Sequence, residues 1–228
     1  MPYDFDNNGW KAEGEEWQLF SSQWRSRSME DVVQSEKIHI LVDSDNMHFF
    51  VREAYRTLLH NVMTHREFHP QGGVLLTGQP GTGWPVFLNS VVQALTELPP
   101  GTTTWLWYFF VSLLANSEDI VLYISGKFHL FHGEQVYTSS APMGMPHSRN
   151  PKRPIWCLID PDFELKGPPH ILFKGGDLRF PVQACSPNGE RYKFWFKERR
   201  PLVYGMPLWN EPDLLSGYVR YYIDLRCV

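Results

Sequence analysis

A glycine-rich turn follows a short hydrophobic run in GVLLTGQPGTGWP, residues 73–85. Gly78 and Gly83 have the spacing of the phosphate-binding loop G-x-x-x-x-G-K-[ST], in which backbone N–H groups surround phosphate oxygens. That loop continues with Lys and then Ser or Thr, but Trp84 and Pro85 stand at these positions. Because the Lys carries the positive charge against the outer phosphates, the sequence predicts a phosphate loop without its main cation.

Two further apolar runs end in residues that suit the same chemistry. IWCLID (155–160) ends in Asp160, and FPVQACSP (180–187) carries Ser186 after its apolar part. An acid at the end of a strand beside a phosphate loop holds Mg²⁺ directly or through water. The sequence therefore predicts that Asp160 binds magnesium beside the loop. The candidate nucleotide-binding residues of the loop are Gly78, Gln79, Pro80, Gly81, Thr82 and Gly83.

These residues require a sheet whose strands end at one common edge. Apolar runs predict strands at 37–42, 73–77, 120–124, 155–160, 170–174, 180–187 and 202–206, and the alternating segment 127–137 predicts edge strands. Helices are expected over 43–68, over 102–119 and from 210. The predicted fold class is α/β, with a mainly parallel sheet and helices on both faces. Such a sheet binds ligands at the carboxyl ends of its strands.

Residues 1–36 are predicted to form a peripheral N-terminal arm, and residues 37–228 a single domain. Trp10, Trp17 and Trp24 recur every seven residues, which places three indoles near one face of a helix. Such a face either docks the arm onto the domain or binds a protein partner.

The composition restricts the possible partners. The 228 residues are 43% hydrophobic and carry a formal net charge of −4, which argues against disorder and gives no reason to expect nucleic-acid binding. The basic segment 193–200 either faces solvent or contacts a phosphate. The most apolar run, 104–115, is shorter than the roughly 20 residues of a membrane span, so no membrane contact is expected.

The remaining cysteines and histidines give weaker signals. Cys157, Cys185 and Cys227 show neither a disulfide framework nor a zinc pattern, and MPYDFDNNGW does not look like a signal peptide. An intracellular protein, cytoplasmic or nuclear, is therefore expected. His129 and His132 would face opposite sides of one strand and would not share a metal. The acidic triplet DSD (43–45) is expected to cap a helix.

Several stretches together resemble the P-loop NTPase-like domain of fungal proteins, akin to Crinkler-type and retrotransposon-hot-spot-type ATPases. They are VREAY (51–55), GVLLTGQPGTG (73–83), WCLIDPD (156–162), VQACSP (182–187) and MPLWNEPDLL (206–215), and the similarity covers roughly residues 37–218. The resemblance implies an ATPase-like fold, with the glycines on phosphate and Asp160 on magnesium. It also implies that Ser186 is the polar sensor beside the γ-phosphate. The family's Lys has no match at its expected place.

Residues 84–101 allow two interpretations of the loop. In the family an aromatic-rich helix begins directly after the loop, and a run of that type begins here only at Thr102. If 84–101 is an insertion, GQPGTG joins TTTWLWYFF, and Thr102 and Thr103 take the Lys and Ser/Thr positions. If the chain is taken literally, 86–95 is the helix after the loop and 102–115 is an additional helix.

Both interpretations lack the Lys, so the expected function is a degenerate nucleotide-binding domain. It would bind ATP or GTP with Mg²⁺ weakly and hydrolyse little or none of it. One alternative is a non-enzymatic module that binds protein through the Trp-containing arm or through 84–101. Another is an active ATPase in which Lys193 or Arg199 replaces the missing cation.

Overall fold

The computed structural model describes residues 3–42, 45–78, 101–146, 148, 153–160, 169–173, 178–185 and 192–207. An eight-stranded sheet has the order β1-β7-β6-β5-β8-β9-β4-β10, and β2 and β3 form a separate two-stranded sheet. The strands are β1 (Lys11–Ala12), β2 (Lys37–Val42), β3 (Asp45–Phe50), β4 (Val74–Thr77), β5 (Ile120–Ile124), β6 (Lys127–His132), β7 (Gln135–Ser139), β8 (Ile155–Ile159), β9 (Arg179–Cys185) and β10 (Leu202–Gly205). The helices are the 3-10 turns η1 (Asp6–Asn8) and η2 (His170–Leu172) and the α-helices α1 (Glu15–Arg25), α2 (Met29–Gln34), α3 (Glu53–Phe68), α5 (Gly101–Ala115) and α6 (Lys193–Arg199).

The large sheet is mixed, so the expectation of a mainly parallel sheet was wrong. β5, β8, β9, β4 and β10 run parallel, whereas β6, β7 and β1 extend the sheet with antiparallel pairing. The cause is the length of two connections, because only residues 125–126 and 133–134 join β5 to β6 and β6 to β7. Two residues can close a hairpin but cannot return the chain for a parallel pair. Ser125 and Gly126 have φ of 49° and 74°, as a type I′ hairpin turn requires.

The three apolar runs at 74–77, 155–159 and 179–185 form β4, β8 and β9, which are parallel neighbours in this sheet. Their placement in one sheet confirms that part of the sequence prediction. Alternate residues enter two separate cores, so that Leu76 and Leu158 face one side while Leu75 and Cys157 face the other. Both faces are covered, which explains why these strands are apolar without interruption.

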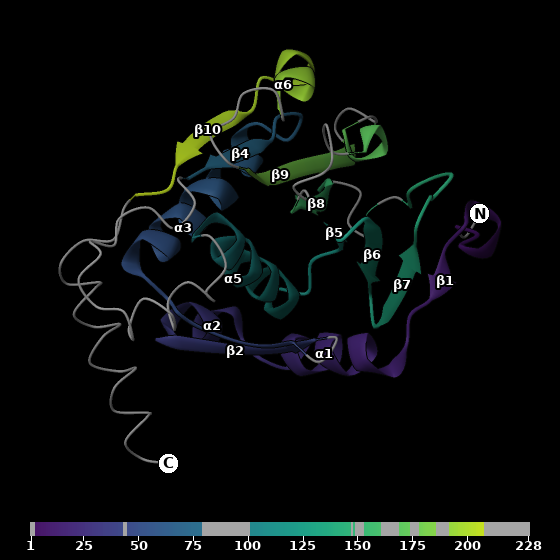
Figure 1. The fold of residues 1–228 in the computed structure, drawn as a ribbon, viewed down its shortest axis with the longest axis horizontal. Coiled ribbons are helices and arrows are strands. Elements are labelled where there is room, and N and C mark those ends of the chain that lie inside the picture. The colour runs from purple at the N-terminus through teal and green to yellow at the C-terminus, as the bar shows by residue number, and fades with distance from the viewer. Residues whose placement is uncertain are drawn as a thin grey trace, which may run out of the picture.

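α5 is the central helix of the larger core (Figure 1). Trp105, Tyr108, Phe109 and Phe110 on this helix are all fully buried. The helix contacts β9, α1, α2 and α3, and Figure 1 shows it between the sheet and the layer that contains α1, α2 and β2. A helix that is apolar around its whole circumference needs such an enclosure. The sequence predicted this helix, although it ends at Ala115 rather than 119.

The N-terminal segment is an integral part of the fold. β1 pairs with β7 as the eighth strand, and α1 and α2 pack against α5. Trp17 and Trp24 on α1 are 4% and 2% exposed and lie in the larger core. Trp10 is fully buried in the smaller core and donates its Nε1–H to the carbonyl of Gly144 over 2.9 Å. The three tryptophans therefore dock the arm onto the domain. They pack against both faces of the sheet and do not lie on one helix face.

Two other local predictions were wrong. Residues 45–50, expected in a helix capped near 43–46, form β3, because every residue from 45 to 50 pairs with a residue of β2. The helix starts only at Glu53, after Arg52. Residues 170–172, expected as a strand, form the 3-10 turn η2. The segments 84–100 and 208–228 lie outside the described residues, so the helices expected at 86–95 and from 210 are not tested.

Candidate functional site

The candidate site lies at the carboxyl edge of the parallel half of the sheet. Gly78 follows β4 and Asp160 follows β8, with β9 between these strands. Because the three strands are parallel, both residues stand at the same edge. Ser186 follows β9 in the sequence but lies outside the described residues, as do residues 79–83 of the loop. The carboxyl edge therefore holds the two described site residues, Gly78 and Asp160.

The strand register fixes how far apart these two residues are. Gln183 of β9 pairs with both Ile159 of β8 and Leu75 of β4, so Asp160 is level with Leu76. Gly78 lies two residues further along β4, and two strand spacings separate the strands by about 10 Å. A direct contact between Gly78 and Asp160 is thus excluded, and a bridge would have to come from residues 79–83, magnesium or a ligand.

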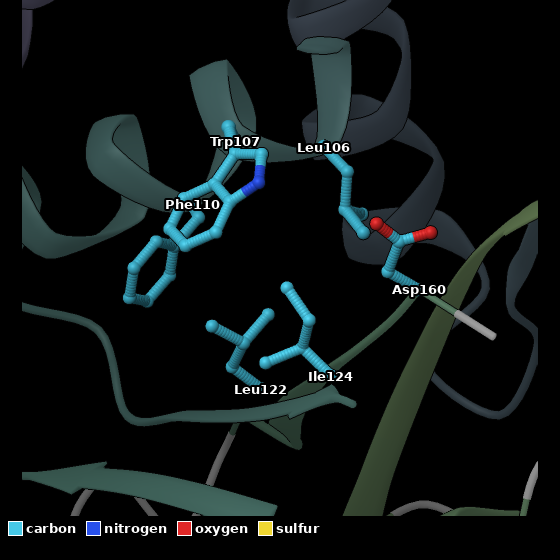
Figure 2. Close-up of a pocket in the computed structure, with 6 residues that line it drawn as sticks. All are labelled: Leu106, Trp107, Phe110, Leu122, Ile124 and Asp160. Carbon is cyan, nitrogen blue, oxygen red and sulfur yellow. The ribbon is translucent and has the colours of Figure 1, made fainter. Parts of the chain in front are cut away.

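Asp160 lines a small pocket between α5 and the sheet (Figure 2). Leu106, Trp107 and Phe110 of α5 line one side of it, and Leu122 and Ile124 of β5 line the other. The Asp160 backbone N–H donates to the carbonyl of Tyr123 over 3.0 Å, which fixes the residue to the end of β5. Figure 2 shows its carboxylate directed toward α5, beside Leu106.

α5 directs its N-terminal end to this same edge. It leads into β5, whose first residue Ile120 is at the amino edge, and β5 is parallel to β8. The helix therefore runs antiparallel to these strands, with Gly101 nearest the carboxyl edge. A helix N-terminus carries unsatisfied N–H groups and a partial positive charge that attract phosphate. Thr102 and Thr103, the two candidate residues in its first turn, thus lie on the element best placed to meet an anion.

Arg199, one of the two residues expected to replace the missing Lys of the phosphate loop, lies at the opposite, amino edge of the sheet. Arg199 of α6 donates to the carbonyls of Gly72, before β4, and Arg179, the first residue of β9, over 3.5 and 2.9 Å. It also donates to the carbonyl of Phe173. These contacts hold its guanidinium at the amino edge, on the opposite side of the sheet from Gly78 and Asp160. Lys193 begins α6 and is exposed.

The other sequence candidates have structural partners. His129 Nδ1 lies 2.9 Å from Glu13 Oε2, and His132 Nδ1 lies 3.4 Å from Asp119 Oδ1, so each histidine lies beside a different acid. Cys157 and Cys185 are both buried. Across the described parts of the chain, no group of three or more His, Cys, Asp or Glu side chains could hold a metal ion. Nor does any helix there have the length and apolar character to cross a membrane.

The pocket beside Asp160 was not foreseen from the sequence. The sequence shows Leu106, Trp107 and Phe110 only as parts of an apolar helix. Their spacing alone does not show which of them face the end of a strand. Comparison with known proteins adds no independent support, because the chain matches no family model, no curated protein and no solved structure. What the site can do therefore follows from its geometry alone.

Proposed function

We propose that the carboxyl edge of the parallel strands binds a nucleoside triphosphate weakly, as a degenerate P-loop domain with little or no hydrolysis. The observation that carries the proposal is the arrival of three elements at one edge. They are Gly78 after β4, where the glycine-rich sequence begins, Asp160 after β8, and the N-terminal end of α5. Nucleotide-binding sheets place their ligands at this edge.

In this proposal each group has a distinct role. The backbone N–H groups of 78–83 and of the first turn of α5 bind phosphate oxygens, and Asp160 holds Mg²⁺ directly or through water. Ser186 would contact the γ-phosphate. No cation stands at the Lys position in the sequence, so the transition-state charge of phosphoryl transfer is poorly neutralised, and catalysis depends almost wholly on that neutralisation. Binding without appreciable turnover is the expected behaviour.

A titration with fluorescent ATP, with and without Mg²⁺, tests this function. Weak saturable binding that needs Mg²⁺ is expected, and Asp160→Asn should weaken it about tenfold or more by removing a metal-binding group. Glu67→Gln is the matched control, because Glu67 is exposed near the end of α3, which leads to the amino edge. Absence of saturable binding, or equal loss in both variants, would contradict the proposal. A complete absence of binding would favour the protein-interaction alternative.

The position of α5 also favours the insertion interpretation of 84–101. α5 is the buried helix over β9, with its first turn at the correct edge, so it can serve as the helix that follows the loop. Deletion of 84–101 should leave a folded protein in which 78–83 leads directly into α5. In that deletion, Thr102→Lys should restore the missing charge and raise ATP affinity, whereas Thr102→Gln should not. An unfolded deletion variant, or equal affinity in the Lys and Gln variants, would refute the interpretation.

A further inference from the structure

Two histidines lie together at the end of α3, on the opposite edge of the sheet from the proposed nucleotide site. His65 and His69 are four residues apart in HREFH, and their ring centroids are 4.9 Å apart. His65 lies in the last turn of α3, and His69 caps the helix with its N–H donating to the His65 carbonyl over 2.8 Å. The pair therefore stays close to the i, i+4 arrangement by which helices bind zinc. Among the described residues, neither imidazole makes a hydrogen bond.

The distance between the rings suits a shared metal ion. With metal–nitrogen bonds of about 2.0–2.1 Å, each ring centroid would lie about 3.2 Å from the metal. Two centroids 4.9 Å apart then give an angle of about 100° at the metal. That angle lies between the roughly 109° of tetrahedral and the roughly 90° of square-planar coordination.

The surroundings keep one of the rings in place. His65 is half-buried, and its ring packs edge-on to Phe180 at a centroid distance of 6.1 Å. Gly72 matters too, because a Cβ there would stand 3.4 Å from His65 Nε2 and 3.1 Å from the carbonyl oxygen of His69. Glycine therefore leaves the space beside these two atoms open.

Charge and ligand number limit which metal can bind. Arg199 donates to the carbonyls of Gln71 and Gly72, so a guanidinium near the site opposes a divalent cation. Since no third His, Cys, Asp or Glu among the described residues joins the pair, water would complete the coordination. Two imidazoles favour late first-row ions, and Cu²⁺ binds such nitrogen ligands more tightly than Ni²⁺ or Zn²⁺.

We propose that His65 and His69 form an open two-imidazole site for a late first-row divalent cation, with Cu²⁺ bound most tightly. The ion would join the last turn of α3 to the residue that caps the helix and brace the turn at Gly72 that leads into β4. This site is independent of nucleotide binding, since it uses the amino edge of the sheet.

Calorimetric titration of the full chain with Cu²⁺, in a buffer that does not bind metals, tests the site. We expect one Cu²⁺ per chain, with at least about a tenfold loss of affinity in His65→Gln and in His69→Gln, because each removes half of the protein ligands. His60→Gln is the matched control, because His60 is an exposed histidine on the same helix, and it should bind as the unaltered chain does.

Electron paramagnetic resonance of the Cu²⁺-loaded unaltered chain provides a measurement that does not depend on any variant. Hyperfine coupling to two imidazole nitrogens is expected. Coupling to fewer than two nitrogens, lack of saturable binding, or a loss in His60→Gln as large as in the other variants would overturn the proposal.

Discussion

The buried side chain of Arg66 offers the sharpest test of the structure. Arg66 is 5% exposed, and its Nη1 lies 3.2 Å from Glu118 Oε2. Its guanidinium also donates to the carbonyl of Pro154 and lies 4.1 Å from the ring centroid of Trp156. Burial lowers the pKa of Arg66, and the charge of Glu118 opposes that shift, although an arginine stays protonated throughout. The side chain thereby joins α3 to the starts of β5 and β8.

The expected cost of Arg66→Met follows from these contacts. Removal of one partner from a buried ion pair costs about 3–5 kcal/mol, because the other charge is left without compensation. Glu118 keeps a second partner here, since Arg153 Nη1 lies 2.9 Å from its Oε1. Part of the cost is therefore avoided, and the free energy of unfolding should fall by about 2–4 kcal/mol.

Urea unfolding followed by tryptophan fluorescence measures this change. Arg153→Met is the matched control, because Arg153 binds the same carboxylate but its side chain is 49% exposed. Because half of the Arg153 side chain is in solvent and Arg66 still compensates the Glu118 carboxylate, the control should lose no more than about 1 kcal/mol and unfold at nearly the original urea concentration. A loss below about 1 kcal/mol in Arg66→Met, or an equal loss in the control, would show that the buried pair does not hold the amino edge together.

Two further predictions concern the arm and the cysteines. Trp17→Ala should lower the free energy of unfolding by about 3–5 kcal/mol, because Trp17 is buried in the larger core. The control Leu19→Ala, on the exposed face of α1, should change it by less than about 0.5 kcal/mol. Equal melting temperatures for the two variants would show that the arm is not part of the core. Burial raises the pKa of the Cys157 thiol to about 12, so iodoacetamide at pH 8 should leave this residue unmodified until urea unfolds the chain, as peptide mass spectrometry would show. Rapid modification of the folded protein would contradict its burial.

Strands and helices could be predicted where they are buried on all sides, because such elements are apolar without interruption. β5, β8 and α5 are such cases, because each is enclosed by other elements and has little polar surface to display. β3 could not be predicted in this way. Its residues 45–50 continue into a helical pattern, and only their pairing with β2 shows that they form a strand.

The candidate site shows the same division between local and long-range information. The acid after an apolar run identified Asp160, and the glycine turn identified Gly78, because both signals lie within a few residues. The amino-edge position of Arg199 and the pocket that Leu106 forms with Asp160 depend on contacts between segments distant in the chain. No pattern within one segment reports such contacts, so the sequence could show neither the place of Arg199 nor the pocket.

The charges at the carboxyl edge show why the nucleotide titration without Mg²⁺ is the decisive one. The described residues that end β4, end β8 and begin α5 carry one full charge, the negative Asp160 carboxylate. The N-terminal end of α5 contributes about half a positive charge. In the proposed site a triphosphate would therefore face a slightly negative edge, and only Mg²⁺ held by Asp160 would reverse its sign. A phosphate loop that keeps its Lys can retain some nucleotide without the metal. In this chain binding should instead disappear when Mg²⁺ is removed, and metal-independent binding would mean that a cation outside these three elements reaches the phosphates.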